Sequence, residues 1–120
     1  MVEVSAIKEE VVQLHAQICS GLADPNRILL IYSLAAGPKN VNEMTKSLDL
    51  PQSTVSRHLK VLRERGIVRA ARDGQSVIYS LADERIIQAL DLLRAMLRDR
   101  LAEQAQLARF DALSAGLDNT

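Results

Sequence analysis

The segment from Pro51 to Gly66 has two chemically different sides when it is wound as a helix. At about 100° per residue, one side collects three apolar residues: Val55, Leu59 and Leu62. Another side collects an amide, short hydroxyls and cations: Gln52, Ser53, Ser56, Arg57 and Lys60. The apolar side can pack on a hydrophobic core, and the polar side can contact base edges and phosphates in a DNA groove. Solvated helix faces usually balance Glu against Lys, whereas this polar side has no acid before Glu64.

The positive charge of the chain is concentrated around this segment. The 120 residues include 15 basic and 15 acidic residues, so the formal net charge is zero. Residues 52–72 nevertheless have a net charge of +5, and the remainder therefore has −5. A basic surface on a neutral protein suits a binder that contacts phosphates and still discriminates between sites. The length suits a single domain, 1–120, with one modest core.

The sequence lacks the signatures of enzymes, secreted proteins and membrane proteins. It has no Ser/His/Asp set, Gly-rich phosphate loop or His-Glu-x-x-His motif, so we expect no catalysis and no cofactor. A single cysteine, Cys19, cannot form an intrachain disulfide, which fits a cytoplasmic protein. The charged N-terminal residues do not resemble a signal peptide, and the longest apolar run, 28–36, is too short to span a bilayer.

Capping and turn residues predict the helices. Apolar residues at helical spacing indicate a first helix over 1–20, and Asp24 is expected to cap the second. Asn40 or Asn42 is expected to cap the third helix, and Gly66 to end the fourth. These two helices form the expected helix-turn-helix, over 41–66.

A β-hairpin and a long helix are predicted to follow. Alternating apolar residues over 67–82 indicate two strands, and Arg72–Gln75 is expected to form the tip. The last helix is expected over 84–112, followed by a frayed tail. The whole pattern predicts a mainly α winged helix-turn-helix with the hairpin as its wing. Met44 and Met96 are expected in the core.

The two terminal helices carry apolar stripes that one short chain has little means to cover. Exposed stripes of this size indicate self-association, so we expect a homodimer. A two-fold dimer suits duplex DNA, because two recognition helices can enter successive major grooves about 34 Å apart. The expected interface residues are Ile7, Val11, Leu14, Ile18, Leu90, Leu93, Leu97 and Leu101.

Three segments resemble motifs of the ArsR/SmtB family of dimeric bacterial repressors. Ser56–Val68 is similar to the core signature of that family, and Leu22–Arg27 resembles its Leu-Ala-Asp-Pro-Thr-Arg motif. Residues 72–83 resemble its wing. The resemblance implies a winged-helix repressor that leaves an inverted-repeat operator when an inducer binds.

The family's usual metal ligands are absent from the matching positions. Its arsenic and cadmium sensors place Cys-Val-Cys where this chain has Asn40, Val41 and Asn42, and Asn supplies no thiolate for a soft metal. Its zinc and nickel sensors use Asp and His pairs at positions that match Asp83, Arg85, Met96 and Asp99. An Arg repels a cation and Met is a poor zinc ligand, so we expect neither metal site.

Cys19 and the two histidines have alternative interpretations. Cys19 is expected to pack as a small hydrophobe, but it is also a candidate redox or reactive-sulfur sensor. His15, one helical turn earlier, could complete a metal site with Cys19 across a dimer axis. His58 is expected to pack or to contact phosphate.

We therefore predict a homodimeric DNA-binding repressor of unknown inducer. The expected DNA-contacting residues are Gln52, Ser53, Thr54, Ser56 and Arg57 in the major groove, and His58, Lys60, Arg63 and Arg72 on phosphates or in the minor groove. The alternatives are a thiol-based or metal-responsive repressor and a winged helix that binds an acidic protein. A MarR-type regulator is disfavoured, because that family usually has a longer wing.

Overall fold

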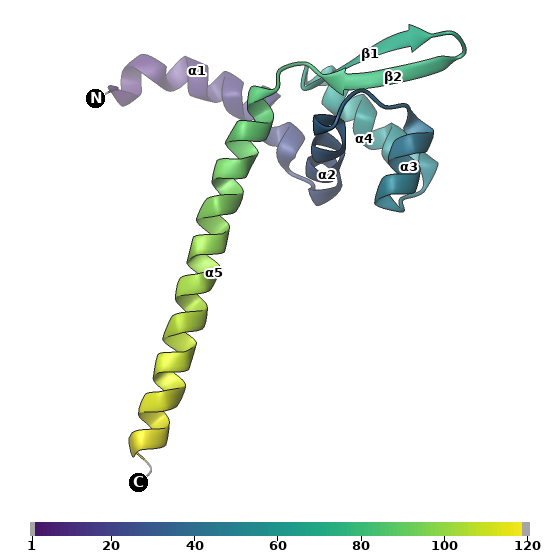
Figure 1. The fold of residues 1–120 in the computed structure, drawn as a ribbon. Coiled ribbons are helices and arrows are strands. Elements are labelled where there is room, and N and C mark those ends of the chain that lie inside the picture. The colour runs from purple at the N-terminus through teal and green to yellow at the C-terminus, as the bar shows by residue number, and fades with distance from the viewer. Residues whose placement is uncertain (1, 119–120) are drawn as a thin grey trace. The chain divides into compact units, whose positions relative to one another are not determined.

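The computed structural model describes residues 2–118. These residues form two units, one up to Ile87 and one from Gln88, and each is described by itself. The elements along the chain (Figure 1) are α1 (Val4–Gln17), the 3₁₀ helix η1 (Cys19–Leu22), α2 (Pro25–Ala35), α3 (Val41–Leu48), α4 (Gln52–Glu64), β1 (Val68–Asp73), β2 (Ser76–Leu81) and α5 (Arg85–Asp118).

The starts of α2 and α3 follow the predicted capping signals. The Asp24 side chain accepts a hydrogen bond from the Asn26 backbone N–H at 2.8 Å, and Pro25 occupies the first turn of α2. Asn40 and Glu43 form a reciprocal capping box, in which each side chain accepts from the other residue's N–H. Local polar side chains therefore fix where both helices begin.

The turn between α3 and α4 and the end of α4 use left-handed backbone. Asp49, after α3, has φ 51°, and Gly66, after α4, has φ 72°. Gly66 is the predicted terminator, and glycine adopts this conformation without the steric cost of a Cβ. The bounds of α3 and α4 thus agree with the predicted helix-turn-helix.

The core of the first unit lies between α2, α3, α4 and the start of β1. Its fully buried side chains share one inward side of each helix: Leu30 and Ile31 of α2, Met44 of α3, and Val55, Leu59 and Leu62 of α4. Leu34, Ile67 and Val68 complete it. The predicted apolar side of α4 is therefore the buried side, and its polar side remains free.

The first strand of the hairpin extends further towards the tip than predicted. β1 and β2 pair antiparallel from Val68 opposite Leu81 to Asp73 opposite Ser76. The loop is reduced to two residues, and Gly74 at its first position has φ 63°. The sequence did not reveal a further bridge, in which Lys39 pairs antiparallel with Tyr79 of β2.

The end of α1 and the 3₁₀ segment after it both lie against the end of α4. No residue of α1 is buried, and Figure 1 shows the helix leading away from α2–α4. The predicted first helix ends earlier than expected, at Gln17, and η1 follows. The Arg65 side chain, at the end of α4, donates a hydrogen bond to the Ala16 carbonyl. Gly21 of η1 packs closely against Ile67, because a Cβ added to Gly21 would lie only 2.7 Å from Ile67 Cδ1.

The second unit is most of α5, which is longer than predicted. The helix continues to Asp118 rather than ending near residue 112; its last turns contain no proline, and the single glycine there, Gly116, does not end it. The end of the predicted tail, residues 119–120, lies outside the described residues. The prediction that Met44 is buried is confirmed, whereas Met96 is 60% exposed and the prediction of a core position is wrong. No helix among the described residues has the length and apolarity needed to cross a membrane.

Candidate DNA-binding surface

The outward side of α4 presents the polar residues singled out in the sequence. Six of the predicted DNA-contacting side chains are exposed on this helix: Gln52, Ser53, Ser56, Arg57, Lys60 and Arg63. Thr54 is half-buried. They share one side because the opposite side is held in the core by Val55, Leu59 and Leu62. The packing of α4 therefore decides which groups face outward.

The cations of this surface have no partners within residues 2–118. Arg57, Lys60 and Arg63 form none of the salt bridges or side-chain hydrogen bonds found there. No described side chain compensates their positive charge, as expected of a surface that binds an anionic partner. No side chain caps the first turn of α4, which leaves N–H groups at its start available to an anionic ligand.

Arg72 belongs to the wing rather than to its tip. It lies in β1 opposite Val77 of β2, and its side chain is exposed. Antiparallel pairing holds Arg72 on a rigid ribbon, two residues from the loop. The wing thus supplies a further unpaired cation in the unit that contains α4.

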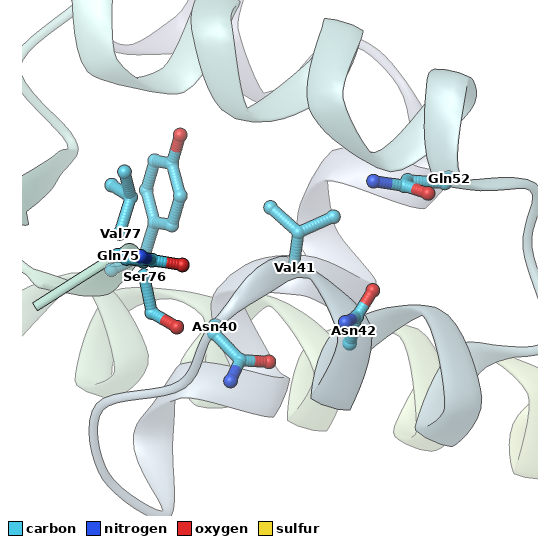
Figure 2. Close-up of a pocket in the computed structure, with 8 residues that line it drawn as sticks. Asn40, Val41, Asn42, Gln52, Gln75, Ser76 and Val77 are labelled. Atoms are coloured by element: carbon cyan, nitrogen blue, oxygen red, sulfur yellow. The ribbon is translucent and has the colours of Figure 1, made fainter.

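A shallow open pocket of about 270 Å³ lies between the start of α3, the start of α4 and the wing. Figure 2 shows Gln52 on one side, Gln75, Ser76 and Val77 of the wing on the other, and Val41 between them. Asn40 and Asn42 complete the polar lining. The sequence alone does not bring Gln75 and Ser76 of the wing to the same pocket as Gln52, because no local pattern reports how distant segments pack together.

His58 does not belong to the outward surface, which corrects the expectation that it holds a phosphate. Its side chain is only 5% exposed, and it points into the unit from the middle of α4. His58 Nδ1 lies 3.3 Å from Arg27 Nη1, and His58 Nε2 lies 4.0 Å from Asp24 Oδ1. The polar start of α2 thus meets His58 inside the protein, where the side chain cannot reach a DNA backbone.

The surroundings of His58 favour its neutral form. Burial lowers the pKa of the imidazole below its ordinary value of 6.5. The Asp24 carboxylate opposes this shift, while Arg27 and Arg57 lower the pKa further. The net result is a neutral ring between an anion and a cation.

Comparison with known proteins identifies the family. A family model described as "Bacterial regulatory protein, arsR family" matches residues 24–70. The HTH-type transcriptional regulator NmtR of Mycobacterium tuberculosis is 39% identical over 82 residues, which cover 66% of this chain and 68% of NmtR. The chain belongs to the arsR family.

Two other regulators match different shares of the chain. The transcriptional regulator Rv0081 of M. tuberculosis is 35% identical over 109 residues, covering 90% of this chain and 94% of Rv0081. The match to the repressor SmtB of M. tuberculosis, 35% identical, spans only 57% of that protein and 64% of this chain. These relatives are transcriptional regulators, so the chain is a DNA-binding transcriptional regulator.

Solved structures confirm the predicted winged helix-turn-helix. The crystal structure of Rv0081 superposes with a TM-score of 0.70 at 33% identity, covering 79% of this chain and 96% of that one. The solution structure of a homodimeric winged helix-turn-helix DNA-binding domain, fragment 1–100 of Mb0332 from Mycobacterium bovis, has a TM-score of 0.69 at 25% identity. That match covers 84% of this chain and 94% of the fragment.

The positions that match the family's metal ligands are occupied differently here. The Asp83 carboxylate is paired with Arg85 at 2.7 Å, and hydrogen bonds from the Arg85 side chain and backbone lower the pKa of Asp83 to about 2. Within residues 2–118, no three His, Cys, Asp or Glu side chains gather in a group that could hold a metal ion. Cys19 and His15 are both exposed within the single chain, so the expected packing of Cys19 as a small hydrophobe does not occur there.

Most residues of the predicted dimer stripes are exposed within the single chain. On α1, Ile7 is half-buried, and the others are exposed: Val11, Leu14 and Ile18. On α5, Leu93, Leu97 and Leu101 are each more than half exposed. Leu90 differs from these residues because it is buried.

Proposed function

We propose that this arsR-family regulator is a homodimeric repressor that binds an inverted-repeat operator through α4 and the wing. Gln52, Ser53, Thr54, Ser56 and Arg57 read base edges in the major groove. Lys60, Arg63 and Arg72 contact phosphates or the minor groove. His58 is left out of this set because it is buried.

The unpaired cations of α4 carry this proposal. Arg57, Lys60 and Arg63 project from the side of α4 opposite the core, and none has an anionic partner within residues 2–118. Surface cations that are merely solvated tend to alternate with acids, and these do not. Arg57 also lies among short polar side chains, the residue types that hydrogen-bond to base edges.

The exposed apolar stripes support a dimer. Leu93, Leu97 and Leu101 recur at helical spacing along α5 and are exposed in the single chain, and Ile18, just after α1, is exposed as well. An exposed apolar stripe along a helix marks an interaction site, and a two-fold pair matches the symmetry of an inverted repeat. The related Mb0332 domain is a homodimer, which supports the same assembly here.

The inducer of this repressor is proposed to be something other than the family's usual metals. Asn40 caps α3, and its side-chain oxygen is already bonded to the Glu43 N–H. Asp83 is neutralised by Arg85. Neither position retains a free ligand set for zinc, cadmium or arsenite.

The proposal is tested by selecting duplexes from a random DNA library with the full-length protein and titrating the selected and random duplexes. An inverted repeat is expected in the selected pool, bound far more tightly than random DNA at salt concentrations of about 50 to 200 mM. A pool without sequence preference would contradict operator recognition. Absence of duplex binding even at low salt would instead favour a protein-interaction role.

A further inference from the structure

A polar cluster around buried His58 joins α2 to α4 behind the proposed DNA-binding surface. It consists of Asp24 and Arg27 at the start of α2 and His58 in the middle of α4. His58 is 4% exposed, and it is the only polar residue buried to this degree among those whose exposure is described, residues 2–116. A buried polar group is costly unless its hydrogen bonds are satisfied, so this cluster constrains how α4 packs.

Arg27 is the hub of the cluster. Its Nε donates to the Gly21 carbonyl at 2.8 Å, and its Nη2 donates to the Ser20 carbonyl at 3.4 Å. Its Nη1 lies 3.3 Å from His58 Nδ1. One guanidinium therefore connects η1, which follows α1, to the helix that carries the proposed DNA-reading residues.

The chemistry of the contact fixes the protonation state of His58. A guanidinium has five donors and no acceptor, so His58 Nδ1 must accept and the ring proton must be on Nε2, towards Asp24. A protonated ring would carry hydrogens on both nitrogens. The protonated Nδ1 would then be a donor facing the Arg27 donor, and the ring's positive charge would lie beside Arg27 and Arg57. Among the described residues, Asp24 is the one anion that acts on it.

We propose that Arg27 is a positioning residue for the DNA-binding helix, acting through neutral His58, and that protonation of His58 breaks this link and weakens DNA binding. The inference rests on the proposed function of α4. Arg57 is next to His58 on α4. The contact of His58 with Arg27 therefore fixes the rotation of α4 about its axis, and this rotation sets the direction in which Arg57 projects. When the hydrogen bond between Arg27 and His58 is lost, Arg57 stays exposed, but its orientation towards the DNA is less well defined.

The link itself is tested with the pair His58→Gln and His58→Leu. Glutamine keeps an acceptor for Arg27 without a titratable group, whereas leucine fills similar space without an acceptor. Because a hydrogen bond to a charged group is lost, His58→Leu is expected to weaken operator binding about tenfold at pH 7.5, while His58→Gln stays within about threefold of wild type. Circular dichroism confirms that both variants are folded.

The contribution of Arg27 is tested with Arg27→Lys, which keeps the charge but cannot bond to η1 and His58 together. Operator binding is expected to weaken about fivefold with an unchanged salt slope, because Arg27 is not a phosphate contact. The same substitution at exposed Arg98 is the control and is expected to have no effect. A reduced salt slope for Arg27→Lys would make Arg27 a DNA contact and overturn its positioning role.

The effect of protonation is followed by NMR of the imidazole and by operator titrations from pH 8 to pH 5. We expect the Nε2–H tautomer at neutral pH and an affinity that falls in step with the protonation of His58. The fall should be absent in His58→Gln and retained in His15→Gln, which removes the other histidine.

Three results would overturn the proposal: an Nδ1–H tautomer at neutral pH, a wild-type affinity that stays constant while His58 gains its proton, or a His58 that remains neutral throughout this range. Failure of the proposed function is distinguishable. In that case Arg57→Ala would leave operator binding intact, although the tautomer and titration of His58 could still be as expected.

Discussion

At the scale of single residues, Arg57 and Arg72 are expected to make different kinds of DNA contact. Arg57 lies among polar side chains on α4, where a bidentate pair with guanine discriminates by about 1–3 kcal/mol. Arg72 lies in β1 of the wing, where backbone or minor-groove contact carries little sequence information.

Alanine substitutions separate the two roles. Arg57→Ala should weaken binding to the operator more than binding to random DNA, and so reduce the ratio of the two affinities. Arg72→Ala should weaken binding to the two duplexes more evenly. It should also reduce the slope of log affinity against log salt concentration by about one per monomer. Titration of both duplexes at several salt concentrations measures this. Equal weakening of both duplexes by Arg57→Ala would make Arg57 a phosphate contact instead.

The residues at the family's metal positions predict insensitivity to metals. Asn40 and Asn42 offer no thiolate and Asp83 is paired with Arg85, so zinc, cadmium and arsenite at micromolar levels should leave operator affinity within a factor of about three. Fluorescence anisotropy with each metal is the measurement. Release of DNA at one metal per protomer, abolished by Cys19→Ser, would assign sensing to Cys19 and His15.

His58 also predicts how stability depends on pH. The folded state lowers its pKa below 6.5, so the unfolded chain takes up a proton first as the pH falls. The free energy of unfolding should therefore decrease below about pH 6.5, until the folded-state pKa is reached. Urea unfolding at pH 7.5 and pH 5.5 measures the change, which His58→Gln should reduce. An identical change in His58→Gln would assign it to other groups.

At the scale of elements, the end of α4 depends on one backbone conformation. Gly66 has φ 72°, and no atom lies within 4 Å of the position that a Cβ would take, so an alanine there meets only backbone strain. Gly66→Ala should destabilise the protein by about 1 kcal/mol. Gly116, inside α5 with equally open surroundings, is the control, and Gly116→Ala should be neutral or slightly stabilising. Equal effects of both in thermal unfolding would contradict this interpretation.

At the scale of the whole molecule, the apolar stripe of α5 predicts that assembly and DNA binding fail together. Leu97→Asp would place a carboxylate in the proposed dimer interface at a cost of several kcal/mol, so we expect monomers in sedimentation and no tight operator binding. Gln106→Asp adds the same charge on the opposite side of the helix and should remain dimeric. A folded monomeric Leu97→Asp protein that still bound the operator tightly would contradict the dimer model.

The sequence by itself determined the elements and their outward chemistry. Asp24, Asn40 and Gly66 mark helix ends because caps and left-handed terminators act within a few residues of the chain. The two sides of α4 could likewise be read from its periodicity, which follows directly from 3.6 residues per turn. The order of elements, the buried side of α4 and its exposed cations therefore needed no tertiary information.

Only the tertiary structure decided which distant residues meet. His58 belongs to the polar cluster because α2 brings Arg27 and Asp24 against α4, and Arg27 and His58 are 31 positions apart in the chain. The Lys39–Tyr79 bridge and the pocket beside Gln52 depend in the same way on how the wing packs. Periodicity places a side chain on one side of its own helix, but it cannot specify the partner on another element, because that partner is selected by the packing of the whole core.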